Sequence, residues 1–296
     1  MIPLLERLKN NEILISDGAM GTMLQAAGLE AGLAPEEWNI SNPEAVKKIH
    51  SSFISAGSDM ITTNTFGANP IKLKRPGLEE KLEEINKAGV KIAKDAANAS
   101  AYVLGDIGPT GEFLKPIGAY DKKQFYDSYF KQAAILYKSG VDAYILETMS
   151  GLDELKIAVS ACKSVGSLPV IASMSFTATD KGYKTMMGVS PEQAVTEMLS
   201  AGCDIIGANC GCGIRQMIEI MCQMRKAVSK SVFLIAQPNA GMPKLINNET
   251  IFSETPQDFA KATPDLIKSG VNIIGGCCGT TPEHIKAIVK ALRLSL

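Results

Sequence analysis

The chain of 296 residues alternates short, wholly apolar runs with longer stretches in which apolar residues recur at helical spacing. Eight apolar runs are predicted to be strands: Ile13–Ala19, Met60–Phe66, Tyr102–Gly108, Ala143–Met149, Val170–Phe176, Ile205–Gly211, Phe233–Asn239 and Ile273–Gly279. The amphipathic stretches are predicted to be helices: Pro43–Ala56, Gly77–Ala99, Lys122–Ser139, Gly151–Ser164, Pro191–Ser200, Ile214–Val228, Thr255–Ser269 and Pro282–Leu294. Strands that are apolar throughout are typical of a parallel sheet covered on both faces, and helix-length connections give right-handed crossovers.

An internal repeat supports this count. Its copies are Ser55–Ile61, Lys138–Tyr144, Ser200–Ile206 and Lys268–Ile274. In each copy a predicted helix ends on a glycine, two residues follow, and a strand begins. The copies precede every second strand, as expected of a barrel built from doubled βα units. We therefore predict an α/β fold with one domain, a single (β/α)8 TIM barrel over residues 1–296.

The competing fold is a doubly wound open sheet, which would place a glycine-rich phosphate loop after its first strand. The segment Gly18–Gly21 does not fit the G-x-G-x-x-G pattern of such a loop. No low-complexity stretch or shift in composition marks a second domain. One long segment, Gln237–Glu254, is predicted to be irregular and to lie over the barrel mouth.

Charge and hydropathy exclude several classes of function. The formal net charge is -1, which gives no overall attraction to nucleic acid or to anionic lipid. No apolar run approaches the roughly 18 residues of a membrane span, and no signal peptide begins the sequence. We expect a cytoplasmic protein with neither a nucleic-acid nor a membrane partner.

The chain contains seven cysteines, an odd number that argues against a disulfide framework. Cys162 and Cys222 fall in helical patterns and Cys203 precedes a strand, so we interpret these three as packing residues. Cys210 ends one predicted strand, and Cys277 and Cys278 end another beside glycines, where adjacent side chains can turn toward one ion. Cys212 remains open as an alternative ligand.

Active sites of barrels are assembled at the C-terminal strand ends. The polar residues expected there, besides the three cysteines, are Asp17, Asn64, Thr65, Asp106, Glu147 and Asn239. For Asn64, Thr65 and Asp106 a second interpretation stays open, in which they cap the following helices.

Three thiolates from two strand ends predict a tetrahedral zinc site with one vacant position, the mark of a catalytic zinc. They leave one net negative charge on Zn²⁺, so an incoming thiol can bind as a nucleophilic thiolate. Zinc hydrolases usually carry harder ligands, with histidine common. The chain has two histidines, His50 and His284, and both are predicted to be surface or helix-cap residues. This chemistry indicates alkyl transfer onto a thiol.

Five motifs together resemble the homocysteine S-methyltransferase family across the whole chain. They are Asp17–Thr22, Thr63–Gly67, Gly105–Pro109, Gly207–Cys210 and Gly275–Thr280. The resemblance implies a homocysteine-binding barrel in which Cys210, Cys277 and Cys278 bind zinc and homocysteine takes the fourth place. It also implies that the turn of Asp17, Gly18, Ala19 and Met20, together with Glu147, holds the amino-acid head group, with Asn239 near the substrate.

The first-strand turn is most similar to the homocysteine-binding N-terminal module of cobalamin-dependent methionine synthase. The sequence has no D-x-H-x-x-G corrinoid loop, so we expect methylcobalamin or another methylated corrinoid to be presented by a partner protein or domain. Two alternatives stay open. One keeps homocysteine but uses a small donor such as betaine or S-methylmethionine, and the other is a zinc-binding or redox protein without enzyme activity.

Overall fold

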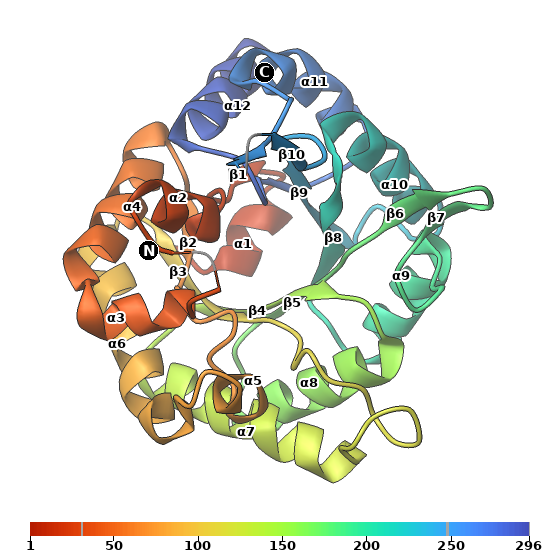
Figure 1. Cartoon of the computed structure of the whole chain (residues 1–296). Helices are drawn as coiled ribbons and strands as arrows, with labels where there is room; N and C mark the ends of the chain where they lie inside the picture. Colours follow the sequence, from red (N-terminus) through yellow and green to blue (C-terminus); the bar gives the residue numbers. More distant parts are fainter. Residues whose placement is uncertain (31, 247–248, 296) are drawn as a thin grey trace.

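Figure 1 shows the computed structural model, which describes residues 1–30, 32–246 and 249–295. Eight parallel strands form one curved sheet around a central axis, in the order β1-β12-β9-β8-β5-β4-β3-β2. Their bounds are β1 Leu14–Ile15, β2 Met60–Thr62, β3 Tyr102–Ile107, β4 Ala143–Met149, β5 Val170–Met174, β8 Ile205–Gly213, β9 Phe233–Asn239 and β12 Ile273–Ile274.

An outer ring of helices covers this sheet (Figure 1). Its members are α4 Pro43–Ala56, α6 Leu82–Ala97, α7 Lys122–Lys138, α8 Leu152–Val165, α9 Pro191–Ser200, α10 Ile214–Lys226, α11 Pro256–Lys268 and α12 Pro282–Ser295. The apolar stripes of these helices and the outward faces of the strands form one large buried cluster. The predicted TIM barrel is confirmed. Among the described helices, none is long and apolar enough to cross a membrane.

The N-terminal helix α1 (Leu4–Lys9) closes one end of the barrel (Figure 1). Leu4 and Leu8 belong to a second buried cluster with residues from the beginnings of the strands, such as Leu14 and Met60. The carboxyl ends of the strands therefore face the opposite, open end of the barrel.

The structure explains the acidic residue of the internal repeat. In each copy the side chain of an Asp or Asn accepts a hydrogen bond, at 2.7 to 2.9 Å, from a backbone N–H near the start of the neighbouring strand. The pairs are Asp59 with Ile15, Asp142 with Val103, Asp204 with Val170, and Asn272 with Leu234. The glycine two residues before each side chain has a positive φ that ends the preceding helix. The repeat thus joins the chain just before each of these strands to the neighbouring strand that precedes it in the sequence.

The sheet order ends at β1 and β2, and one backbone hydrogen bond and one side-chain hydrogen bond join these two strands. The Ile15 carbonyl accepts a hydrogen bond from the Asp59 N–H at 2.7 Å, and the Asp17 carboxylate accepts one from the Thr62 N–H at 2.8 Å. The barrel is therefore nearly closed, with a carboxylate in place of a backbone acceptor.

Several elements differ from the sequence-based prediction. Gln237–Glu254 is not irregular, because β9 extends to Asn239 and is followed by a hairpin of β10 (Lys244–Ile246) and β11 (Glu249–Ile251); Asn247 and Asn248 lie outside the described residues. A second hairpin, β6 (Thr177–Thr179) with β7 (Gly182–Lys184), follows β5. Helix α1 and the short elements α2 Met20–Ala26, η1 Pro35–Glu37, α3 Trp38–Ser41 and α5 Pro70–Lys74 were not predicted either, whereas η2 Glu79–Lys81 lies within the predicted helix Gly77–Ala99.

Candidate active site

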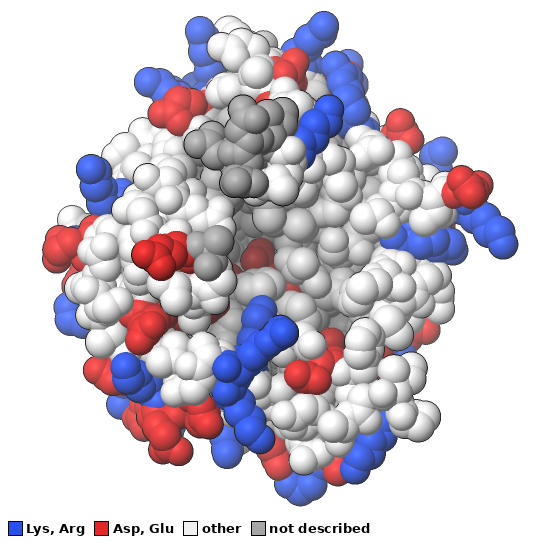
Figure 2. Space-filling view, in the orientation of Figure 1, with Lys and Arg blue, Asp and Glu red and all other residues white. Residues whose placement is uncertain are grey.

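A cavity of about 240 Å³ opens among the carboxyl ends of the strands. Most residues predicted for the site line it: Asp17, Gly18, Ala19, Met20, Asn64, Asp106, Glu147, Cys210, Cys277 and Cys278. In Figure 2, which has the orientation of Figure 1, charged side chains lie mainly around the circumference, and acidic atoms lie inside the central hollow. The open end of the barrel thus has an acidic interior, and Lys and Arg side chains lie at the lower edge of the hollow in this view, near α5 (Figure 2).

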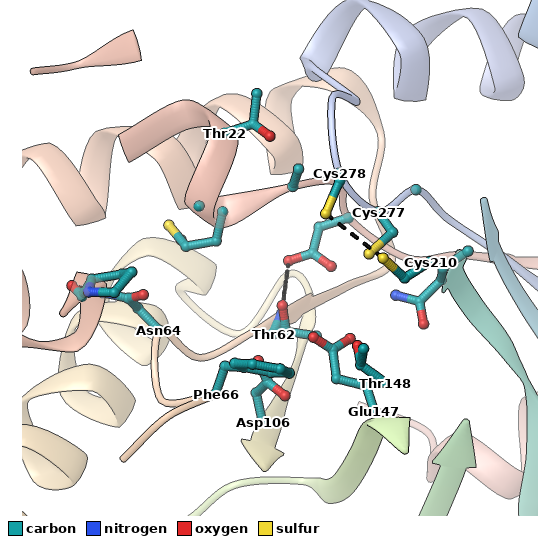
Figure 3. A pocket seen from close by; sticks show the side chains of 18 of the residues that line it. Thr22, Thr62, Asn64, Phe66, Asp106, Glu147, Thr148, Cys210, Cys277 and Cys278 are labelled. Carbon is teal, nitrogen blue, oxygen red and sulfur yellow. Dashed lines mark hydrogen bonds between the residues drawn. The ribbon is translucent and has the colours of Figure 1, made fainter. Parts of the chain in front are cut away.

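The three predicted cysteine ligands converge in this cavity (Figure 3). The sulfur atoms of Cys210, Cys277 and Cys278 all lie within 4.8 Å of one another, and the Sγ atoms of Cys210 and Cys278 are 3.8 Å apart. A tetrahedral ion with Zn–S bonds of about 2.3 Å requires sulfurs separated by about 3.8 Å. The arrangement therefore fits zinc without rearrangement of this pair.

The backbone around the thiols adopts conformations that point them inward. Cys210 has a φ of 58°, in the left-handed region that is uncommon for residues other than glycine. After β12, the Cys277 N–H donates to the Pro238 carbonyl at 2.8 Å, and the Ala240 N–H donates to the Cys278 carbonyl at 2.9 Å. A Cβ on Gly276 would collide with the Thr280 side chain, so the tight turn requires glycine there.

Asn209 is the residue that joins these segments, and the sequence analysis did not give it a role. Its Oδ1 accepts from the Thr148 N–H at 2.8 Å and the Ser173 hydroxyl at 2.7 Å, while its Nδ2 donates to Thr148 Oγ1 at 2.8 Å. The same Nδ2 lies 3.8 Å from Cys277 Sγ. Thr148 has a φ of 58°, which is costly for a β-branched residue. Asn209 therefore holds both a strained strand end and a thiol; its position directly before Cys210 was the available signal.

The thiols interact strongly with one another. Hydrogen bonds from Cys277 and Cys278 lower the pKa of Cys210 to about 3, because they stabilise its thiolate. The bond to Cys210 raises the pKa of Cys278 to about 12 and also raises that of Cys277. Without a metal the cluster thus favours one thiolate and two thiols, and a divalent cation would be needed to ionise all three.

Two carboxylates on the cavity wall have raised pKa values. Burial, opposed by hydrogen bonds from Thr62, raises the pKa of Asp17 to about 7. Burial and then the nearby Asp17 raise the pKa of Glu147 to about 8. The Asp17 carboxylate accepts hydrogen bonds from Thr62 and Ser16, whereas the Glu147 carboxylate has no hydrogen bond to a described residue. Glu147 is thus the carboxylate of this pair that is available to a ligand.

The other predicted polar residues have different surroundings. Thr65 is buried away from the cavity and donates to the Asp106 carbonyl at 2.7 Å, so it braces β3. Asn64 lines the cavity, but its Nδ2 donates to the Pro35 carbonyl and to Asn39. Asn239 is buried at the end of β9, and its side chain helps to lower the pKa of Cys210 by hydrogen bonding.

Cys212 is fully buried in the large hydrophobic cluster, and burial raises the pKa of its thiol to about 12. It does not belong to the group of converging thiols. Cys162 and Cys203 are buried and Cys222 is half-buried. These four cysteines therefore have the surroundings of packing residues.

The prediction that both histidines lie at the surface or cap helices was wrong for His50. That residue is fully buried on α4, and neither ring nitrogen has a hydrogen-bond partner among the described residues. It shares the inward stripe of α4 with Val46, Ile49 and Phe53, so helical position overrode side-chain polarity. His284 does act near a helix start, because its Nδ1 accepts from the Thr281 N–H at 3.1 Å.

Comparison with known proteins supports one family. The sequence profile described as "Homocysteine S-methyltransferase" matches residues 14–292. Methionine synthases of Mycobacterium tuberculosis and Mycobacterium leprae are each 31% identical to the chain, over 96% and 98% of its length; the match covers 25% of each synthase, so the chain spans about a quarter of these relatives. The metallated form of the homocysteine methyltransferase MmuM from Escherichia coli shares the fold, with a TM-score of 0.80, 22% identity, and coverage of 97% and 98% of the two chains.

Proposed function

Because the chain belongs to the homocysteine S-methyltransferase family, we propose that it activates the thiol of homocysteine at the three-cysteine centre and transfers a methyl group to that thiol. Family membership confirms the resemblance in the sequence motifs and the prediction of an enzyme, against the alternative of a zinc-binding or redox protein. The observation that carries the proposal is the convergence of Cys210, Cys277 and Cys278 in a cavity open at the carboxyl ends of the strands.

We infer that the three thiols hold a zinc ion, since their spacing fits its ligand geometry and all three donors are soft sulfur. Bound zinc would supply the positive charge that lowers the pKa of a substrate thiol. Three protein ligands leave a tetrahedral position for that thiol. The protein itself fixes the three sulfur atoms, through Asn209 and the turn at Gly276. It also leaves the fourth coordination position open toward the cavity.

The amino-acid head group of homocysteine is proposed to lie between Glu147 and the turn of Asp17, Gly18, Ala19 and Met20. An ammonium beside Glu147 would restore the charge of a carboxylate whose pKa is raised to about 8 in the empty cavity. The turn lines the cavity, and backbone N–H groups of such a glycine turn suit a carboxylate. Asp17 supports the shape of this turn, because its carboxylate accepts from the Thr62 N–H and its carbonyl accepts from the Gly276 N–H.

The proposed methyl donor is methylcobalamin or another methylated corrinoid carried by a partner protein or domain. Two observations support this donor. The chain is 31% identical to methionine synthases, of whose length the match covers a quarter, and its first-strand turn is similar to that of the synthase module. A cavity of about 240 Å³ admits the side chain of an amino acid, whereas a corrinoid would have to present its methyl group from outside.

Methionine formation from homocysteine, with each donor in turn, tests this proposal. We expect slow methylation by free methylcobalamin, because the orienting contribution of a docked carrier is absent. A methylated corrinoid protein from the same cell should raise the rate by orders of magnitude, while betaine and S-methylmethionine give only background. Robust turnover with either small donor would refute the corrinoid assignment, and removal of zinc by a chelator should abolish all turnover.

A further inference from the structure

Asp106, at the end of β3, has a side chain with an unsatisfied acceptor. The residue is 5% exposed, and its carboxylate Oδ1 is buried without a hydrogen-bond partner in the described part of the chain. Its backbone, in contrast, is firmly held: the N–H donates to Thr63 Oγ1 at 3.0 Å, and the carbonyl accepts from Thr65 Oγ1 at 2.7 Å. The local structure thus fixes where the carboxyl group lies but leaves part of it unpaired.

This geometry removes the interpretation of Asp106 as a helix cap. The next helix, α7, begins at Lys122 and is capped by Asp121, which accepts from the Gln124 N–H at 2.9 Å. A buried polar atom without a partner costs roughly 1–3 kcal/mol, and more when it is charged. A carboxyl group that lies on a cavity wall despite this unfavourable free energy is therefore a candidate for ligand contact.

The surroundings of Asp106 define the ligand that it would accept. It lines the same cavity as Glu147 and Asp17, and Figure 3 shows the Asp106 and Glu147 side chains on the same side of that cavity, below the thiols. Burial, and then the charges of Glu147 and Asp17, raise its pKa well above the usual range. The nearby Lys72 ammonium lies 4.2 Å from the centroid of the Phe66 ring, and no ion pair joins it to a described carboxylate. A cation with several N–H donors could donate hydrogen bonds to Asp106 and Glu147 at once and offset their negative charges.

We propose that Asp106 is a second acidic contact for the α-ammonium of the amino-acid substrate, beside Glu147, and that it selects thiols that carry this ammonium. The inference rests on the proposed function. An alkylammonium has three N–H donors, so it can bind the carboxyl groups of Glu147 and Asp106 simultaneously. A thiol that carries only a carboxylate would bring neither N–H donors nor a positive charge to these two acids.

Two thiols that differ in one group test this inference. Homocysteine and 4-mercaptobutanoate have the same chain, thiol and carboxylate, and the latter lacks the amino group. Their affinities for zinc-loaded protein would be measured by titration calorimetry for wild type, Asp106→Asn and the control Asp153→Asn. Asp153 has a side chain that is 69% exposed and does not line the cavity.

We expect Asp106→Asn to weaken homocysteine binding at least about tenfold, the value of a charge-assisted contact, and to change 4-mercaptobutanoate binding by less than about twofold. Zinc content should stay at the wild-type level. In turnover assays KM for homocysteine should rise while kcat is retained, because the ammonium contact exists in both the bound and transition states. Asp153→Asn should leave both affinities unchanged.

An equal loss of affinity for both thiols in Asp106→Asn would overturn the inference, because it would indicate a structural role. Unchanged affinity for homocysteine would overturn it as well. If Asp106→Asn does not fold, Asp106→Ser carries the same comparison with a smaller side chain. Failure of the wild-type protein to bind homocysteine would instead refute the proposed function. The two failures are therefore distinguishable.

Discussion

Buried His50 should make the protein acid-sensitive in a narrow pH range. Its imidazole is fully buried without a partner, and burial lowers its pKa from 6.5 to about 4. The unfolded chain therefore takes up a proton near pH 6.5, whereas the folded protein resists protonation down to about pH 4. The contribution of His50 to stability is thus present above pH 6.5 and is lost as pH falls toward 4.

The magnitude follows from the shift. A difference of 2.5 units between 6.5 and 4 corresponds to about 3.4 kcal/mol at full development, with about 2 kcal/mol already lost at pH 5. Raised pKa values act in the opposite direction: Asp17 and Glu147 bind protons more tightly when folded, so acid stabilises the protein through them. The pH dependence of the wild type alone cannot isolate His50, and a difference between variants is required.

Urea unfolding of wild type, His50→Gln and His50→Leu, followed by circular dichroism from pH 7 to pH 4.5, provides that difference. Both variants lack the titrating ring, so both should lose about 2 kcal/mol less than wild type between pH 7 and pH 5. Their absolute stabilities will differ, because one side chain is polar and the other apolar. Curves for wild type and both variants that run parallel across this range would refute the reasoning.

Three further predictions concern the site. Cys277→Ala should lower zinc affinity by more than about 100-fold, while Cys212→Ser keeps one zinc per chain; zinc retained in the first variant, measured by metal analysis, would mean that the ligand set is wrong. Glu147→Gln should weaken homocysteine binding by about 30-fold, or about 2 kcal/mol, at unchanged zinc content, and unchanged affinity in calorimetry would remove Glu147 from the site. Asn209→Ala should lower zinc affinity by about 10- to 100-fold, because Cys277 and Thr148 lose their common partner; wild-type affinity in a competition titration would contradict that role.

Periodicity predicted the barrel because each strand and each outer helix has a repeating apolar face. It overestimated the lengths of β1 and β12, predicted over Ile13–Ala19 and Ile273–Gly279 but confined to Leu14–Ile15 and Ile273–Ile274. In both places the chain leaves the sheet to form the turns of the site, which still contain buried residues. The hairpin Thr177–Lys184 escaped prediction because β6 is fully exposed and lacks an apolar face. His50 could have been predicted as buried from its place on the stripe of α4, and residue type misled the interpretation.

The cysteines of the site were predictable because adjacent thiols beside glycines at a strand end have few other uses. For the polar residues around them, the strand-end position predicted that Asp106 lies at the site but not its role, and it gave no role to Asn209. In the structure, the hydrogen bonds of the two side chains distinguish the role of Asn209 from that of Asp106. Asn209 directs both of its side-chain atoms to Thr148 and Ser173, so its bonding is completed by protein, whereas Asp106 keeps a buried oxygen unpaired on a cavity wall. Because these partners lie on strands far apart in the sequence, only the folded chain distinguishes a residue that builds the site from one placed to bind its ligand.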